Sequence, residues 1–304
     1  MAAIELKKVE LPNGETLGYR EREGGDKIVL FIHGNMTSSK HWDVVLENLD
    51  EKYKVYAVDL RGFGASTYNK PIMKIKDFSD DVRLFVEALN IQPYAIVGWS
   101  TGGSVGMQYC ADYENPCEKL LLLAPGSTRG YPFFATGENG LPDVNQRLKT
   151  YEEIKGDAGK TKAVQGAYDR KDKEFLKTMW NMAIYRNKQP DPLKYDEYLE
   201  DMLTQRNLAE VYHALNIFNI SHVHNGVTAG TGEVDKINVP VFLMWGSDDI
   251  VVTEQMKNET LEDLGDKVTY RELPNCGHSP LVDNLDLLME TIEDFLANKE
   301  VSKR

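Results

Sequence analysis

A glycine-rich turn around Ser100 contains the residues of this sequence that are best suited to chemistry. Gly98-Trp99-Ser100-Thr101-Gly102-Gly103 follows the apolar run 94–97 and precedes a helix-like stretch, 104–113. A serine hydroxyl is a weak nucleophile until a base takes its proton and the backbone presents it to the substrate. A sharp turn from strand to helix presents the hydroxyl, and glycines on either side leave the space it needs. This context favours a nucleophilic Ser100 over an ordinary Gly/Ser turn.

A nucleophilic serine needs a histidine base, and His278 is the candidate. The base in turn needs a carboxylate that orients it. The sequence has six histidines. His278 follows the strand-like run 268–273 and the turn Pro274-Asn-Cys-Gly277, a loop position that is poorly suited to core packing. We therefore expect His278 to lie over an edge of the sheet.

The carboxylate is expected on the loop after the apolar run 241–245. That run ends in Gly246-Ser-Asp-Asp249, whereas the loop 124–130 after the preceding strand contains no acidic residue. Asp248 and Asp249 are both candidates, and their spacing alone does not separate them.

Short β-rich runs alternate with amphipathic helical stretches along most of the chain. This alternation predicts an α/β protein with a largely parallel sheet and helices on both faces. Pro12-Asn-Gly14 predicts a hairpin turn between the first two strands. The expected strands are 4–11, 15–20, 27–32, 53–58, 94–97, 119–124, 241–245 and 268–273, and the expected helices are 39–49, 77–89 and 104–113.

The alternation stops at Pro125 and resumes at Val239-Pro240. The intervening segment has no convincing strand and shows apolar stripes at helical spacing. These stripes are Phe175, Leu176, Met179, Trp180, Ala183 and Ile184 after the capping-type Asp172, then Tyr195, Tyr198, Leu199, Met202 and Leu203, then Val211, Leu215 and Phe218. We therefore expect a core of residues 1–125 and 237–304, with residues 126–236 inserted as a helical cap.

Five motifs in this order resemble the α/β-hydrolase superfamily. They are Phe31-Ile-His-Gly-Asn35, Asp59-Leu-Arg-Gly-Phe-Gly-Ala-Ser66, the Ser100 turn, Trp245-Gly-Ser-Asp-Asp249 and Cys276-Gly-His278. The order serine, aspartate, histidine is also that of this superfamily. The resemblance implies an α/β-hydrolase fold with an inserted helical cap and catalysis without a cofactor or metal.

The resemblance also implies roles for individual residues. The acid of the triad is placed at Asp249, three residues after Gly246, and Asp248 is then solvated or holds the loop. The oxyanion hole is placed at two backbone N–H groups, that of Thr101 after the nucleophile and that of Asn35. His33 is expected to shape its loop rather than to act as a second base.

The substrate pocket is expected where aromatic residues leave the sheet beside the nucleophile. Arg129-Gly-Tyr131-Pro-Phe133-Phe134 is turn-rich and follows a strand directly. We expect Tyr131, Phe133 and Phe134 to line an acyl pocket together with Met36 and Trp99. The alternative is that the rings only pack the cap. The pair His222 and His224 lacks a nearby acidic ligand and is expected on a loop, not at a metal site.

The implied activity is hydrolysis of a carboxylic ester through an acyl-enzyme. Serine at the turn argues against the epoxide-hydrolase and dehalogenase branches, which need a carboxylate nucleophile. Residues 32–39, 129–134 and 224–227 are similar to the intracellular poly-hydroxyalkanoate depolymerases of the Bacillus type, which implies a polymeric ester substrate. The alternatives are a small-molecule carboxylesterase or lactonase, a cofactor-free haloperoxidase or perhydrolase, and a hydrolase-fold ligand receptor.

The composition argues against several classes of partner and location. The formal charge of −13 without a basic stripe argues against nucleic acid and anionic membranes as partners. The apolar runs are of strand length, too short to span a membrane, and the N-terminal residues lack the apolar core of a signal peptide. Three cysteines without metal-like spacing indicate reduced thiols, so a cytoplasmic location is expected. The oligomeric state is not fixed by the sequence.

Overall fold

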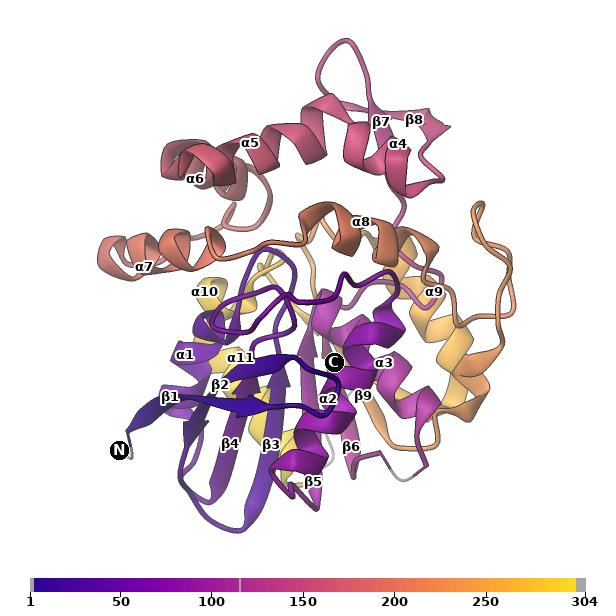
Figure 1. The fold of residues 1–304 in the computed structure, drawn as a ribbon. Helices are drawn as coiled ribbons and strands as arrows, with labels where there is room; N and C mark the ends of the chain where they lie inside the picture. The colour runs from indigo at the N-terminus through magenta and orange to yellow at the C-terminus, as the bar shows by residue number, and fades with distance from the viewer. Residues whose placement is uncertain (1–2, 115, 299–304) are drawn as a thin grey trace.

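The computed structural model describes residues 3–114 and 116–298, which form one large sheet covered by helices. Eight strands run in the order β1-β2-β4-β3-β5-β6-β9-β10 (Figure 1). β2 pairs antiparallel with β1 and β4, and all the other pairings are parallel. The predicted α/β class with a mostly parallel sheet is confirmed. The strands are β1 Ile4–Glu10, β2 Thr16–Arg22, β3 Lys27–Ile32, β4 Tyr53–Val58, β5 Tyr94–Trp99, β6 Lys119–Leu123, β9 Val241–Gly246 and β10 Val268–Leu273.

Helices cover both faces of the sheet. α2 (Ile75–Ala88) and α3 (Thr101–Asp112) pack together on one face, and α1 (Asp43–Asn48) and α11 (Leu285–Leu296) pack together on the other (Figure 1). Every residue of the central strands β5, β6 and β9 is buried. Parallel strands covered on both faces need such continuous apolar runs, which is why the sequence pattern revealed them. Two further helices, α9 Glu254–Leu264 and α10 Pro280–Asp283, complete this part of the chain.

The segment between β6 and β9 is mainly helical and lies over the carboxyl ends of the parallel strands (Figure 1). The predicted stripe of α7 is buried except for Leu203, whereas in the predicted stripe of α6 Phe175 is exposed. Asp172 accepts a hydrogen bond from the N–H of Phe175 and begins α6, which buries Leu176 and Trp180. The division into core and cap at residues 126 and 236 stays a prediction. The helices are α4 Tyr151–Gly156, α5 Ala163–Arg170, α6 Lys173–Ala183, α7 Pro192–Met202 and α8 Leu208–Ile217.

The expectation that this segment contains no strand was wrong. β7 (Phe134–Thr136) and β8 (Pro142–Arg147) form a two-stranded antiparallel sheet. β8 was not predicted because its residues are mostly polar and exposed. They lack the apolar alternation that marks a half-buried strand. The Asn139-Gly140 pair was the available signal, since Gly140 has a φ of 78° in the connecting turn.

The inserted segment leaves the sheet and returns to it at neighbouring points. The N–H of Ile220 donates to the carbonyl of Thr128 at 2.9 Å, so the outgoing and returning chains lie side by side. Arg129 fixes this junction to α9 through two hydrogen bonds to Asp263, 3.0 Å from Nε and 2.8 Å from Nη2. The junction is thus attached to a core helix. Within the described residues, no helix has the length and hydropathy that crossing a membrane would require.

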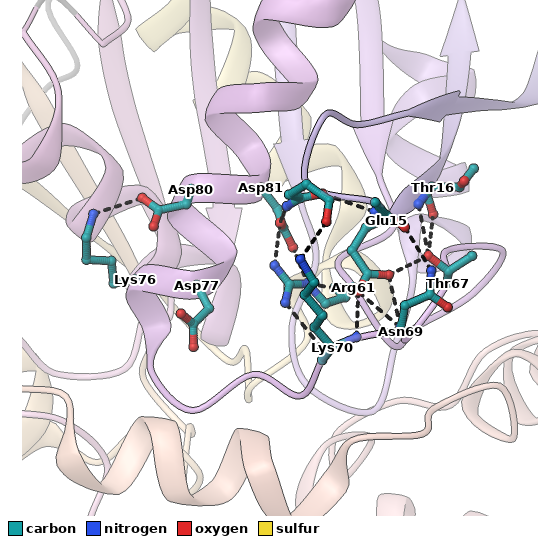
Figure 2. Close-up of polar contacts among 12 residues, drawn as sticks. Glu15, Thr16, Arg61, Thr67, Asn69, Lys70, Lys76, Asp77, Asp80 and Asp81 are labelled. Atoms are coloured by element: carbon teal, nitrogen blue, oxygen red, sulfur yellow. Dashed lines mark hydrogen bonds and ion pairs between the residues drawn. The ribbon is translucent and has the colours of Figure 1, made fainter.

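A buried ionic cluster attaches the first hairpin to the loop after β4 (Figure 2). Arg61 donates from Nε and Nη2 to the two carboxylate oxygens of Asp81, at 2.7 and 2.6 Å. The Glu15 carboxylate lies 3.9 Å from the Arg61 Nε and accepts the backbone N–H groups of Asn69 and Lys70. Because the cluster joins the β1–β2 turn, the 59–70 loop and α2, it fixes the loop whose Leu60 N–H donates to His33, two residues before Asn35.

We expect Arg61→Met to lower the free energy of unfolding by about 3–5 kcal/mol, since it leaves the buried Asp81 carboxylate without its cation. The control is Lys76→Met, on the helix α2 that also carries Asp81. Lys76 and Asp80 are 2.8 Å apart but half-exposed, and we expect the loss of this ion pair to cost less than about 1 kcal/mol of stability. Urea denaturation of both variants measures the difference. Equal costs would mean that the cluster does not hold the fold.

Candidate active site

The backbone at Ser100 has the strained conformation of a nucleophile turn. Its φ is 54° and its ψ is −119°, and α3 begins at the next residue. A Cβ on Gly98 would lie 2.4 Å from the carbonyl oxygen of Gly102, and one on Gly102 would lie 2.2 Å from that of Ile32. The two glycines are therefore required by the close approach of strand, turn and helix. Such local strain is typical of functional sites.

His278 and Asp249 form a buried hydrogen-bonded pair. The imidazole Nδ1 lies 2.8 Å from Asp249 Oδ2. The other oxygen, Oδ1, accepts the N–H groups of Val251 at 2.8 Å and Val252 at 3.0 Å. An ionised carboxylate only accepts hydrogen bonds, so the His278 Nδ1 that faces Asp249 carries the proton. The other ring nitrogen of His278, Nε2, is then the basic one.

Asp248 has different surroundings from its neighbour. Its side chain is exposed, and its Oδ2 accepts a hydrogen bond from Asn187 Nδ2 at 2.7 Å. Of the two acids that the sequence left open, the structure brings Asp249 to His278 and leaves Asp248 on the outer side of the loop.

Trp99 connects the histidine loop to the nucleophile turn. Its indole Nε1 donates to the backbone carbonyl of His278 at 2.9 Å, and the two rings lie 5.8 Å apart between centroids. The indole also packs edge-on against Trp42, with 6.3 Å between ring centroids. Because Trp99 precedes Ser100 directly, this bond places the His278 loop beside the nucleophile turn. Trp99 therefore supports the His278 loop. Its predicted contact with substrate stays a prediction.

The two predicted oxyanion donors belong to segments that adjoin Ser100. The N–H of Thr101 is at the first position of α3, where no partner exists within the helix and the helix dipole favours negative charge. The loop that contains Asn35 also lies close to Ser100, since a Cβ on Gly34 would lie 3.2 Å from Ser100 Cβ. Met36, next to Asn35, is almost completely buried and has a φ of 62°.

His33 shapes this loop, and both of its ring nitrogens are occupied. Nδ1 donates to the carbonyl of Gly34 at 2.7 Å, and Nε2 accepts the N–H of Leu60 at 2.9 Å. Complete burial lowers the pKa of His33, which keeps the ring neutral. With both nitrogens occupied by the backbone, His33 is unsuited to serve as a second base.

Gln205, which follows α7, is a contact residue that sequence reasoning missed. Its Nε2 donates to Asn35 Oδ1 at 2.8 Å, and its Oε1 accepts from the hydroxyl of Tyr168 at 3.0 Å. The inserted segment thus holds the side chain of the residue whose backbone N–H is the predicted oxyanion donor. No signal in a single sequence distinguishes this glutamine from a surface one, because its partners are distant in the chain.

The three predicted pocket aromatics have separate environments. Phe133 is 3% exposed and packs on Tyr212, with 4.7 Å between ring centroids, inside the inserted segment. Phe134 begins β7 and lies under the guanidinium of Arg147. Burial raises the pKa of Tyr131 to about 12, and the nearby Asp249 carboxylate acts in the same direction. The shift indicates that the Tyr131 hydroxyl lies in the neighbourhood of Asp249.

We expect Tyr131→Ala and Phe133→Ala to have different effects. Loss of a pocket wall at Tyr131 is expected to lower kcat/KM for long acyl esters roughly 10- to 200-fold more than for an acetyl ester. Phe133→Ala is expected to cost about 3–5 kcal/mol of stability and to affect neutral esters of all acyl lengths alike. Melting temperature and kcat/KM across acyl lengths measure both. A uniform loss for Tyr131→Ala would assign its ring to packing.

The histidine pair on the returning loop does not converge on a common point. His222 Nε2 lies 3.0 Å from the exposed carboxylate of Asp235, whereas His224 Nδ1 accepts the N–H of Gly226. In residues 3–114 and 116–298 there is no cluster of three or more His, Cys, Asp or Glu side chains that could hold a metal ion.

Comparison with known proteins identifies the family of the fold. A 2-hydroxy-6-oxononadienedioate/2-hydroxy-6-oxononatrienedioate hydrolase of Pseudomonas sp is 22% identical over 301 residues, 96% of each chain. A monoacylglycerol lipase of Homo sapiens is 25% identical over 293 residues, 92% of this chain and 78% of the lipase. The structure of an esterase from Exiguobacterium antarcticum has a TM-score of 0.71 at 17% identity, covering 96% of this chain and 99% of the esterase. The family profile of the α/β-hydrolase fold matches residues 27–285. The chain belongs to the α/β-hydrolase fold family.

Proposed function

We propose that the chain is a carboxylic ester hydrolase that works through an acyl-enzyme at Ser100 without a cofactor. The observation that carries this proposal is the buried 2.8 Å hydrogen bond between Asp249 and His278 on a loop bonded to Trp99, the residue before Ser100. A serine, an oriented histidine and two converging backbone donors are the parts that acyl transfer needs. The esterase and lipase among the similar proteins support the same reaction type.

In the acylation step, Ser100 Oγ attacks the ester carbonyl while His278 Nε2 takes the hydroxyl proton. The carbonyl oxygen becomes an oxyanion that accepts hydrogen bonds from the N–H groups of Thr101 and Asn35. When the intermediate collapses, the C–O bond to the alcohol breaks, and His278 gives its proton to the leaving oxygen. Asp249 stabilises the imidazolium that forms in between and holds its tautomer.

In the deacylation step, water repeats the chemistry of the serine. His278 Nε2 removes a proton from water as the water oxygen attacks the acyl carbonyl. The oxyanion that forms accepts hydrogen bonds from the same two N–H groups. Collapse breaks the bond to Ser100 Oγ, which receives the proton from His278. The products are a carboxylic acid and the free enzyme.

The resemblance to poly-hydroxyalkanoate depolymerases makes a polyester one candidate substrate beside small esters and lactones. The free thiols of Cys110, Cys117 and Cys276 support a reducing, cytoplasmic location for either. The test is labelling with a fluorophosphonate probe, followed by turnover of acyl esters of increasing length, lactones and amorphous poly-3-hydroxybutyrate. Labelled protein that hydrolyses none of the esters or lactones would contradict an ester hydrolase and favour a ligand-binding role.

A further inference from the structure

Lys160 places an ammonium group among three aromatic rings of the inserted segment. It lies in a π-helical turn, Ala158–Lys162, between α4 and α5. Its Nζ is 4.4 Å from the ring centroid of Phe133, 5.3 Å from that of Tyr131 and 5.4 Å from that of Tyr212. Aromatic faces attract a cation through the ring quadrupole. The ammonium is therefore held in place by ring faces.

Within the described residues, the Lys160 ammonium has no hydrogen-bonded or ion-paired acceptor. The acid nearest in sequence, Asp157, is engaged elsewhere: Oδ1 accepts from the Thr136 hydroxyl and the Lys160 backbone N–H, both at 2.8 Å, and Oδ2 accepts the Thr136 N–H at 2.8 Å. The attraction of the ring faces is not a hydrogen bond to an oxygen acceptor. The three N–H donors of the ammonium therefore stay available to a ligand. By contrast, Lys173 on α6 lies 2.8 Å from Asp196 and 2.5 Å from Glu200.

Hydrogen bonds connect the surroundings of Lys160 to the residues around Ser100 at two places. The stretch of chain that carries Tyr131 begins beside the nucleophile, where the N–H of Gly126 donates to the carbonyl of Ser100 at 3.4 Å. In α5, which follows the π-helical turn, the hydroxyl of Tyr168 donates to Gln205 at 3.0 Å, and Gln205 donates to Asn35 at 2.8 Å. The ammonium therefore lies in the part of the inserted segment that is hydrogen-bonded to the surroundings of Ser100.

We propose that Lys160 binds a carboxylate that the substrate carries away from its scissile ester. The preferred substrates would be anionic esters, such as half-esters of dicarboxylic acids or hydroxyacid oligomers with a free carboxyl end. This proposal rests on the ester hydrolase function proposed above. An N⁺–H···O⁻ bond at a half-buried site is strong and directional. The chain as a whole carries −13 and repels anions, so binding one near Ser100 needs a local cation without a carboxylate partner.

The test compares each 4-nitrophenyl half-ester of glutaric and adipic acid with its neutral methyl diester, after subtraction of spontaneous hydrolysis. Lys160→Met is expected to lower kcat/KM for the half-esters roughly 10- to 150-fold while changing that for the diesters less than about threefold. Lys160→Arg is expected to keep most of the preference. The control is Lys155→Met, which removes an exposed lysine 5.4 Å from the single ring of Tyr151 and should change neither rate.

The pH dependence of the wild-type enzyme provides a second, variant-free measurement. Burial lowers the pKa of Lys160 to about 8, with Asp157 opposing the shift, and the other titratable groups around it are the hydroxyls of Tyr131 and Tyr212. The ammonium is charged below that pKa. The ratio of half-ester to diester kcat/KM should therefore be high at pH 7 and fall as the pH rises through about 8, because any ionisation that affects both substrates equally cancels in the ratio.

Three outcomes separate the possibilities. A ratio that is flat with pH, or the same in Lys160→Met and wild type, would overturn carboxylate binding while turnover of the diesters leaves the hydrolase function intact. Equal losses on both substrates would assign Lys160 to packing and overturn it as well. Failure to turn over either substrate, with Ser100 unlabelled, would refute the proposed hydrolase itself.

Discussion

Replacing Ser100 by alanine is expected to lower kcat about 10⁶-fold and leave the fold intact. The reaction loses the oxygen that forms the acyl bond, and no other group can take its place. Alanine keeps the Cβ, so the strained φ of 54° costs about the same in both proteins. Steady-state kinetics and the melting temperature measure the two effects. Mass spectrometry of probe-labelled wild type should locate the adduct on Ser100.

Ser104, one turn further along α3, provides a matched control. Its hydroxyl is buried and has no hydrogen-bond partner among the residues that the structure describes. Removal of a buried, unsatisfied hydroxyl is near neutral for stability, so Ser104→Ala should keep wild-type turnover and labelling. A covalent adduct on any residue other than Ser100 would reject the proposed mechanism.

The second large effect is expected at Asp249. Asp249→Asn should lower kcat about 10⁴-fold, because an amide favours the wrong tautomer of His278 and no longer stabilises the imidazolium. Asp248→Asn is the matched control, since its side chain is exposed and bonds to Asn187 instead. We expect it to change kcat less than about fivefold, in line with the weak coupling of an exposed side chain.

Stability must be measured beside activity for these two variants. Asp249 also accepts the N–H groups of Val251 and Val252, and an asparagine oxygen can keep those bonds. A melting temperature close to that of wild type would therefore assign the loss to chemistry. If Asp248→Asn were the more damaging substitution, the proposed identity of the acid would be wrong.

The parts that the sequence predicted well are those with a local physical cause. β5, β6 and β9 are buried on both faces, so their apolar runs are uninterrupted and visible in one dimension. The Ser100 turn needs Gly98 and Gly102 for close approach, which leaves a recognisable spacing. The start of α6 at Asp172 also follows from a local hydrogen bond, to the N–H of Phe175.

The parts that were missed depend on contacts between distant residues. Asp248 and Asp249 are equivalent in a strand-and-loop pattern, so the prediction of Asp249 needed the family resemblance, and the hydrogen bond to His278 distinguishes the two in three dimensions. Gln205 and Lys160 carry no pattern of their own, because their partners lie elsewhere along the chain. The β7–β8 sheet is polar and exposed, so it lacks the apolar periodicity from which strands are predicted.

The 2.9 Å bond between Ile220 and Thr128 has an evolutionary consequence. An excursion that starts and ends at one place can be lengthened, shortened or exchanged by recombination without altering the strand order of the sheet. Arg129 and Asp263 then mark the junction that a transplanted segment would have to respect, because they attach it to α9. Exchange of the whole inserted segment can therefore change the substrate range, while β5, α3 and the Ser100 turn are conserved.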